Sequence, residues 1–178
     1  PQGVVGVAAT VDRPLDQALA GSPRLVVVLL DARDPGNAGT VIRTADAAGA
    51  DAVVLATGDG GGSVDVHNGK AVRASAGSLF HLPIATGAWP QVLPALRTAG
   101  LRVLATAAHG ALDLFAADLG GPTAWVLGNE AHGLAAEAVE ACDAAVAIPI
   151  RGRAESLNVA AAAAVCLYAS ARAQADAP

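Results

Sequence analysis

The feature that most constrains the fold of this chain is the alternation of short β-branched runs with alanine-rich stretches. The run at residues 24–30 is almost wholly apolar, which is typical of a strand buried on both faces of a parallel sheet. We predict strands at residues 24–30, 52–55, 82–85, 101–106, 123–127 and 144–148. We predict helices at residues 37–48, 89–99, 134–142 and 157–174. Strands alternating with helices predict an α/β fold, a mostly parallel sheet with helices on both faces.

Polar residues and glycines mark several boundaries between these elements. Asn37 is a candidate cap for the helix at 37–48, and Gly49 is a candidate stop. Ser156 is a candidate cap for the last helix, which carries Asn158. Residues 57–69 are rich in glycine and are predicted to form a loop.

Composition bounds the class of protein. A chain of 178 residues is about one domain, and its 53% hydrophobic and 15% charged residues predict an ordered globular fold. No apolar run suggests a membrane span. A net charge of −5 and 3% aromatic residues argue against a domain that holds nucleic acid by bulk charge or by a stacking sheet. An RNA substrate would therefore need help from a second subunit or another domain.

The cysteines and histidines give no sign of a metal site. Cys142 and Cys166 lie in apolar surroundings without metal-ligand spacing, so we interpret them as small core residues in preference to a metal or redox role. The four histidines are scattered, and no pair has ligand spacing. These features favour the reducing cytoplasm.

Two common nucleotide-binding signatures are incomplete. The loop at 58–63 resembles a GxGxxG fingerprint, but Ser63 stands at its third glycine position. The stretch at 68–71 lacks the upstream glycine and the hydroxyl residue of a phosphate-binding loop. Both observations disfavour an NAD-dependent oxidoreductase or an ATP-binding fold, and a surface loop is the simpler interpretation of 57–69.

The segment from Asp34 to Ala45 combines a Pro-Gly turn with a helix start. Arg43 follows Asn37 by six residues, which places the two within about 120° of each other around a helix. Both side chains could face one cleft at a helix N-terminus, a natural site for phosphate. The alternative is a helix cap and a solvated arginine.

Three further segments carry unusual chemistry, and each has an ordinary structural alternative. Residues 127–134 run from a strand into two glycines and a polar pair, where a flat ligand could approach the backbone, or where an ordinary turn could form. Residues 148–160 place a proline between two isoleucines ahead of a helix. This segment could be a binding loop, or it could be only the start of a capped helix. Residues 70–77 bring two cations near a hydroxyl, which could contact phosphate or form a solvated helix face.

Taken together and in this order, the four segments resemble the SpoU (TrmH-like) branch of the SPOUT RNA methyltransferases. The matching motifs are N…G…R-T-A from Asn37, G-N-E-x-x-G-L from Gly128, and I-P-I…S-L-N-V-A from Ile148. The resemblance spans residues 2–171, and residues 70–84 look like the ribosomal RNA methyltransferases that include thiostrepton-resistance enzymes.

The resemblance implies a fold with a C-terminal trefoil knot, an exception to the rule that chains are unknotted. It implies S-adenosyl-L-methionine as cofactor, bound in a bent form in the knot, and a homodimer whose active site borrows from both subunits. The implied activity is RNA 2′-O-ribose methylation, of ribosomal RNA in preference to transfer RNA. Methylation of a base nitrogen and a non-catalytic RNA-binding protein that keeps the fold are the alternatives.

The resemblance also assigns roles to residues of this chain. The implied catalytic residues are Asn37, Arg43, Glu130, Ser156 and Asn158. The implied cofactor-binding residues are Thr106, Leu127, Gly128, Glu130, Ile148, Ile150, Ser156, Leu157 and Asn158. Arg43, Lys70 and Arg73 are expected to contact RNA.

Proteins of this kind usually carry an N-terminal RNA-recognition domain of about a hundred residues. The first residues of this chain resemble the join just after that domain. We therefore expect residues 1–178 to be the catalytic domain, residues 1–23 to be a linker leading into it, and the recognition domain to be absent from this chain.

Overall fold

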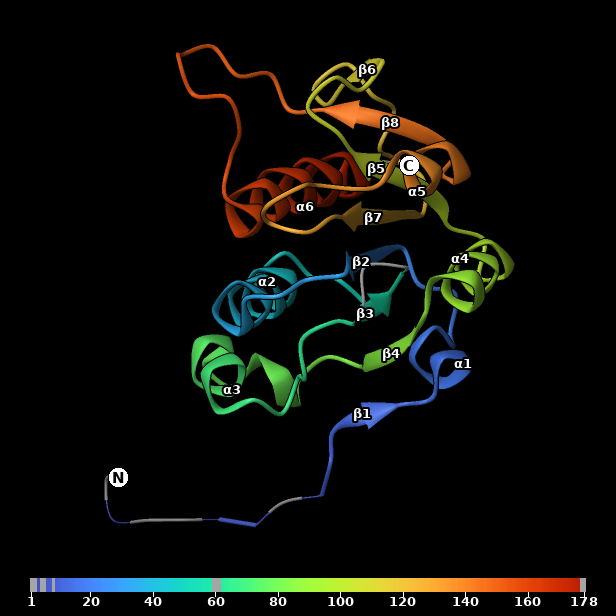
Figure 1. Ribbon diagram of the computed structural model, residues 1–178. Coiled ribbons are helices and arrows are strands. Elements are labelled where there is room, and N and C mark those ends of the chain that lie inside the picture. The colour runs from blue at the N-terminus through green and yellow to red at the C-terminus, as the bar shows by residue number, and fades with distance from the viewer. Residues whose placement is uncertain (1–2, 4–5, 8, 59–61, 177–178) are drawn as a thin grey trace.

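The computed structural model describes residues 3, 6–7, 9–58 and 62–176, and it is built around one eight-stranded sheet (Figure 1). The strands follow the order β1-β4-β3-β2-β7-β5-β8-β6 across the sheet, and every pairing between them is parallel. Their bounds are β1 (Asp12–Arg13), β2 (Leu25–Leu30), β3 (Ala52–Thr57), β4 (Ile84–Ala88), β5 (Arg102–Thr106), β6 (Leu112–Asp113), β7 (Thr123–Leu127) and β8 (Ala144–Ala147). The predicted parallel α/β fold is confirmed, while the trefoil knot stays a prediction.

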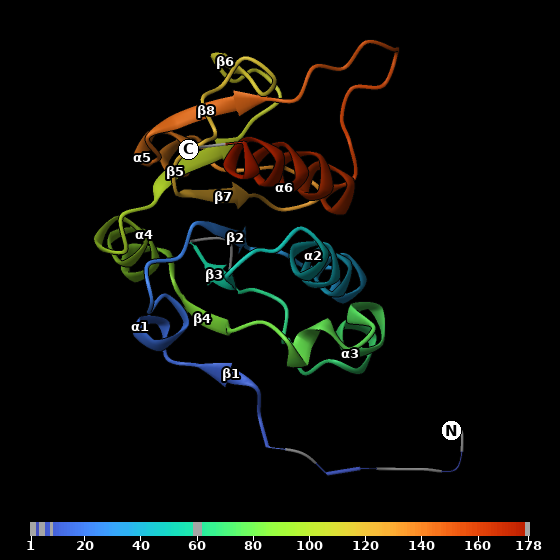
Figure 2. The ribbon, with the colours of Figure 1, turned by 180° about the vertical axis from the view of Figure 1, so that it is seen from behind.

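Helices cover both faces of the sheet, as predicted. Helices α2, α3 and α6 lie on one face, and α1, α4 and α5 lie on the other (Figures 1 and 2). The helix bounds are α1 (Leu15–Ala18), α2 (Pro35–Ala47), α3 (Gly69–Ser75), α4 (Trp89–Thr98), α5 (Ala136–Ala141) and α6 (Val159–Ala175), with a 3₁₀ turn at Ser78–Phe80. Each face therefore has its own core.

Successive side chains of the central strand β2 pack alternately into these two cores. Val27 and Leu29 of β2 pack with the core under α2 and α6, whereas Val26 and Val28 pack with the core under α4 and α5. Trp125 is fully buried in the first core, and its indole Nε1–H donates to Ser170 Oγ at 2.8 Å. That bond satisfies a polar group that burial would otherwise leave without a partner.

The two cysteines are buried free thiols, in agreement with the core interpretation. Burial raises the pKa of Cys142 to about 11, with a smaller contribution from Asp143, and it raises the pKa of Cys166 to about 12. Both thiols are therefore protonated and unreactive at neutral pH. Within the described ranges, no cluster of three or more His, Cys, Asp or Glu side chains could hold a metal ion. None of the helices in those ranges is both long and apolar enough to cross a membrane.

The structure corrects two predicted helix caps. Asp34, and not Asn37, caps α2: its Oδ1 accepts from the Gly36 N–H at 2.9 Å. The following proline fits the first helical turn, because that turn needs no N–H and its backbone angle suits the ring. At α6 the cap is Asn158, and not Ser156, because Asn158 Oδ1 accepts from the N–H of Ala160 at 2.8 Å.

Other differences concern element ends and short elements. Strand β4 lies at 84–88 where 82–85 was predicted, and α5 begins at 136 where 134 was predicted. The expected linker at 1–23 contains β1 and α1, although residues 1–2, 4–5 and 8 of it lie outside the described residues. The predicted loop at 57–69 has residues 59–61 outside the described part, and α3 begins at its last residue.

Candidate active site

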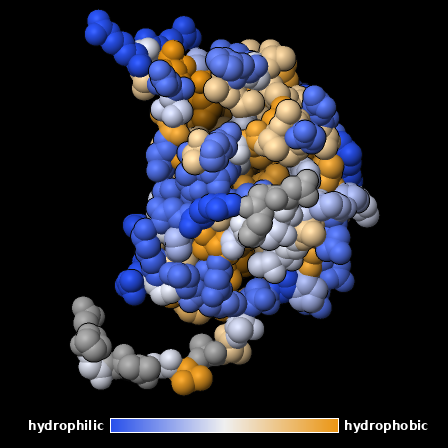
Figure 3. Space-filling view, viewed as in Figure 1, coloured by the Kyte–Doolittle hydropathy of each residue, from blue (hydrophilic) through white to orange (hydrophobic). Residues whose placement is uncertain are grey.

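A pocket of about 800 Å³ lies at the carboxyl ends of β5, β7 and β8. Ligands of parallel α/β sheets bind at this edge, because the loops that leave the strands gather there. Here the two main loops are residues 128–134, after β7, and residues 148–158, between β8 and α6. The second loop projects from the body in Figure 1, and Figure 3 shows hydrophobic surface beside it.

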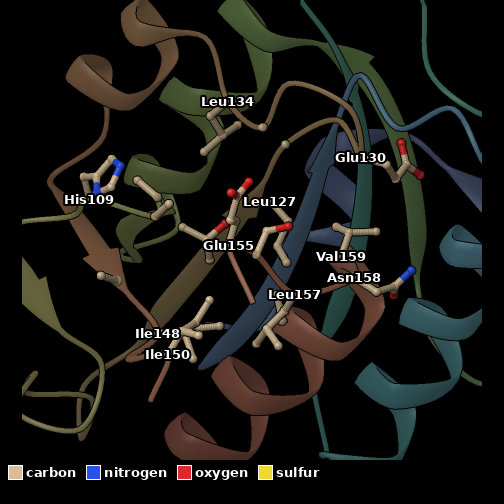
Figure 4. Close-up of a pocket in the computed structure, with 18 of the residues that line it drawn as sticks. His109, Leu127, Glu130, Leu134, Ile148, Ile150, Glu155, Leu157, Asn158 and Val159 are labelled. Carbon is tan, nitrogen blue, oxygen red and sulfur yellow. The ribbon is translucent and has the colours of Figure 1, made fainter. Parts of the chain in front are cut away.

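All nine predicted cofactor residues line this pocket: Thr106, Leu127, Gly128, Glu130, Ile148, Ile150, Ser156, Leu157 and Asn158. Figure 4 shows Ile148, Ile150 and Leu157 together on one side of the cavity, and Glu130 and Asn158 together on another. Ile150 and Leu157 are 37% and 42% exposed, so the pocket offers apolar surface that the described chain does not cover. Such a mixture of apolar walls and a few polar groups is typical of small-molecule sites.

The loop after β7 closes on itself with no room for a side chain at Gly128. A Cβ atom there would lie 2.2 Å from the carbonyl carbon of Gly133 and 2.3 Å from the amide nitrogen of Leu134. Two backbone hydrogen bonds hold the loop closed: Asn129 N–H donates to Gly133 O at 3.0 Å, and Gly133 N–H donates to Asn129 O at 2.8 Å. Gly133 has φ +70°, the left-handed conformation that glycine adopts most easily. The glycine pair of the motif therefore sets the shape of the pocket wall.

A chain of side-chain hydrogen bonds joins the three sequence motifs beside the pocket. Asn37 Nδ2 donates to Glu130 Oε1 at 3.3 Å, and Asn158 Nδ2 donates to Asn37 Oδ1 at 3.1 Å. Asn158 Oδ1 in turn caps α6. The predicted catalytic residues Asn37, Glu130 and Asn158 are thus brought together from positions 93 and 121 residues apart.

The groups at the two ends of this row of hydrogen bonds, the Glu130 carboxylate and the N-terminus of α6, fix the direction of each bond between them. An ionised Glu130 only accepts, so Asn37 must turn its NH₂ group toward it and keep its carbonyl for Asn158. The N-terminus of α6 only donates, so Asn158 must turn its carbonyl toward the helix and its NH₂ group toward Asn37. Each amide therefore has one orientation that satisfies both of its neighbours.

Glu130 is held in its charged form. Burial raises the pKa of its carboxyl group, but hydrogen bonds from its own backbone N–H and from those of Asp34 and Arg33, with a further bond from Asn37, outweigh burial. The pKa of Glu130 is therefore below its ordinary value. Asp34 N–H donates to Glu130 Oε1 at 3.1 Å, and Arg33 N–H donates to Glu130 Oε2 at 3.2 Å. The carboxylate thus ties the loop after β7 to the start of α2.

Asn129 makes a second tie of the same kind, one that sequence reasoning missed. Its Nδ2 donates to Asp31 O at 3.0 Å, and its Oδ1 accepts from Ala131 N–H at 2.8 Å. Asp31 has φ +55° and accepts from Gly58 N–H at 2.8 Å. An aspartate directly after a buried strand, beside a turn, was the available signal.

The remaining predicted site residues lie away from the pocket lining or at its edge. Arg43 is exposed on α2, and neither Arg43 nor Asn37 is among the pocket-lining residues, so a cleft shared by these two side chains stays a prediction. Lys70 Nζ pairs with Asp34 Oδ1 at 2.6 Å, and this bond, with that from the Gly36 N–H, lowers the pKa of Asp34. Arg73 is exposed on α3, on the same face of the sheet as α2 (Figure 1).

The segments that form this site match a known protein family. The model of the SpoU rRNA Methylase family matches residues 24–168, which include the pocket, the loops and the hydrogen-bonded chain. The chain is 43% identical over 143 residues to the 23S rRNA (guanosine(2553)-2′-O)-methyltransferase RlmP of Bacillus subtilis, covering 80% of this chain and 56% of that protein. It is 38% identical over 178 residues to the 23S rRNA (uridine(2479)-2′-O)-methyltransferase of Streptomyces viridochromogenes, covering 97% of this chain and 61% of that protein.

A solved structure shares the fold. The AdoMet-bound rRNA methyltransferase from Sinorhizobium meliloti superposes with a TM-score of 0.82 at 38% identity, over 90% of this chain and 60% of that one. The chain therefore spans between 56% and 61% of the length of these three proteins.

Proposed function

We propose that this chain, which belongs to the SpoU rRNA methylase family, is the catalytic domain of an S-adenosyl-L-methionine-dependent RNA 2′-O-ribose methyltransferase. The observation that carries the proposal is the chain of hydrogen bonds from Glu130 through Asn37 to Asn158, at the edge of the 800 Å³ pocket. It joins all three motifs of the resemblance at one place. The names of the two relatives support ribosomal RNA as the substrate in preference to transfer RNA.

The pocket fits the proposed cofactor. Apolar walls from Leu127, Ile148 and Leu157 suit a flat adenine ring, and Gly128 lets the loop after β7 close tightly to form a further wall. Glu130 and Glu155 bring carboxylates to a ligand that carries positive charge on its sulfonium and its amino group. When bound, this group supplies an electrophilic methyl.

The protein must then make a ribose hydroxyl nucleophilic, because that hydroxyl is a weak acid at neutral pH. Arg43 is a poor base, since a guanidinium hardly ever gives up its proton. We favour a role in which Arg43 grips the substrate phosphate and stabilises the developing alkoxide, while a phosphate oxygen takes the proton. The alternative, in which Arg43 itself takes the proton, requires a neutral guanidinium. Asn37 and Ser156 would orient the ribose in either case.

The position of Arg43 supports a homodimer. Six residues of helix place it about 9 Å along α2 from Asn37, on an exposed part of the surface. Helices α2 and α6 lie side by side, and Tyr168 of α6 is 53% exposed. We therefore propose that two copies pack through α2 and α6, so that Arg43 of each acts at the pocket of the other. Lys70 and Arg73 would extend the RNA-binding surface along α3.

Two further proposals follow from the same reasoning. Residues 1–178 form the catalytic part of a protein that relies on another domain or subunit to hold its RNA, because the net charge of −5 repels phosphate. A ribosomal RNA substrate and two free thiols fit a cytoplasmic location.

Calorimetry tests the cofactor proposal directly. We expect the 178-residue chain to bind S-adenosyl-L-methionine and its demethylated product. Absence of binding at millimolar ligand would refute the proposed function. Transfer is then measured as 2′-O-methylnucleosides released from ribosomal and transfer RNA transcripts, with a longer relative as the positive control. Cofactor binding with transfer to transfer RNA alone would correct the substrate. Cofactor binding without any transfer by a longer protein that includes this chain would favour a non-catalytic protein.

A further inference from the structure

A second pocket, of about 860 Å³, lies on the other side of the loop after β7. The carboxyl ends of β2 and β3, the start of α4 and the helix α5 line it, together with the loop itself. Its volume is within the range of small-molecule sites, about 300–1,000 Å³. None of the nine predicted cofactor residues contributes to this lining.

The walls of this second pocket combine an aromatic ring with carboxylates. Trp89, the half-buried first residue of α4, lines it together with Pro90. Asp31 and Glu137 supply two carboxylates, and Arg33 supplies a cation. Two carboxylates disfavour phosphate as the occupant, because like charges repel. An aromatic wall with hydrogen-bond acceptors suits an unstacked RNA base, which proteins hold by stacking and by contacts to its edge.

The acceptors point to one base in particular. Asp31 Oδ1 is already engaged by the Gly58 N–H at 2.8 Å. Glu137, in the first turn of α5, has no hydrogen bond or ion pair with any residue that the structure describes. Guanine presents two neighbouring donors, N1–H and the N2 amino group, and a carboxylate can accept from both. Adenine and uracil offer a single donor on that edge.

We propose that the second pocket holds a guanine base of the RNA, with its N1–H and N2–H groups donating to Glu137 and its ring against Trp89. The inference rests on the proposed function, because it takes the ligand from the RNA substrate. The two pockets share Asn129 and residues 131–134 as a common wall. A guanine in the second pocket is therefore held next to the nucleotide whose ribose faces the cofactor pocket, and it selects the sequence at which methyl transfer occurs.

The test uses guanosine 5′-monophosphate as the probe, with the chain saturated by S-adenosylhomocysteine so that the cofactor pocket is closed to the nucleotide. Ligand-observed NMR measures dissociation constants in the millimolar range expected for one nucleotide. The comparison nucleotides are inosine 5′-monophosphate, which lacks the N2 amino group, and adenosine 5′-monophosphate. The variant is Glu137→Gln, and the matched control is Glu140→Gln, a loss of the same charge on the same helix outside both pockets.

We expect the wild-type chain and Glu140→Gln to bind the guanosine nucleotide at least about fivefold more tightly than the other two, as a hydrogen bond to a charged group would provide. Glu137→Gln should reduce this preference to about twofold or less. The inference is overturned if the three nucleotides bind equally to wild type, if none of them binds, or if both variants behave alike. Affinity for S-adenosylhomocysteine, measured on the same samples, separates the two proposals, since its loss in wild type would remove the proposed function itself.

Discussion

The hydrogen-bonded chain from Glu130 to Asn158 has a direction, and replacing its middle member by an aspartate should break it. Asn37→Asp keeps the size and shape of the side chain but turns its donor into an acceptor. The new carboxylate would face Glu130 Oε1 across the 3.3 Å that now separates donor and acceptor. Asn37→Ala is the comparison variant, because it adds no charge while it removes both this hydrogen bond and the one that Asn37 Oδ1 accepts from Asn158.

The structure sets the size of the expected effect. Loss of the bond from Asn37 costs about 1 kcal/mol of unfolding free energy. Two like charges about 4 Å apart add about 1 kcal/mol in water and more in a less polar surrounding, and the low figure applies because Glu130 is exposed. The total for Asn37→Asp, which keeps the bond from Asn158, is therefore about 2 kcal/mol, and Asn37→Ala, which loses both hydrogen bonds, also costs about 2 kcal/mol. In a chain of 178 residues, 2 kcal/mol lowers Tm by about 4–8 °C.

The effect should also depend on pH, with a definite sign. In the wild type the pKa of Glu130 is lowered by folding, so its contribution is present at neutral pH and is lost as the pH falls through the folded-state value. In Asn37→Asp the two carboxylates raise each other's pKa. The variant is therefore penalised most at neutral pH, and acid relieves the penalty by protonating one of the pair.

Urea unfolding followed by tryptophan fluorescence measures these differences, because Trp125 is buried in the core. We expect the difference in unfolding free energy between wild type and Asn37→Asp to narrow as the pH falls from 8 toward about 5. The difference in unfolding free energy between wild type and Asn37→Ala should change less with pH, because alanine adds no ionisable group. If the difference in unfolding free energy for Asn37→Asp does not narrow in acid, or narrows no more than the difference for Asn37→Ala, the direction assigned to these hydrogen bonds is wrong.

Three other perturbations test the proposed site. Gly128→Ala should abolish cofactor binding in calorimetry and cost about 1–3 kcal/mol or more of unfolding free energy, because its Cβ overlaps the backbone of Gly133; wild-type affinity would contradict this. Arg43→Ala, placed in a longer protein that includes this chain, should slow single-turnover transfer at least about a hundredfold and leave cofactor affinity nearly unchanged, whereas a proportional loss of affinity would make Arg43 structural. Tyr168→Asp should turn a dimer into a monomer in light scattering, and a wild-type chain that is monomeric at high concentration would exclude packing through α6.

The regular part of the fold was predictable because its signals are local. Strand β2 is apolar at every position and β3 at all but its last, and the glycine at 49 follows the end of α2 with φ +76°, as its place after the last helical residues predicts. Two-residue strands such as β1 and β6 gave no signal, since their pairing with β4 and β8 is decided by the rest of the sheet. The two cap errors have another cause. Several adjacent residues could each serve as a cap, and only the surrounding packing chooses among them.

The residues of the site could be predicted from the sequence, but the hydrogen bonds between them could not. The motifs identified Asn37, Glu130 and Asn158 as residues of one site, but their hydrogen bonds join segments 93 and 121 residues apart. Local sequence carries no information on which amide faces which carboxylate. The exposed position of Arg43 shows the same limit, because a helix period gives the angle between two residues and does not give what lies beside the helix.

The wall shared by the two pockets has a kinetic consequence. Two backbone hydrogen bonds between Asn129 and Gly133 close it, and further bonds from Asn129 to Asp31 and from Glu130 to the start of α2 fasten it to the sheet edge. Because so many hydrogen bonds hold this loop in place, it does not need one ligand to be bound before it can bind the other. We therefore expect cofactor and RNA to add in random order, each with an affinity that is nearly indifferent to the presence of its companion.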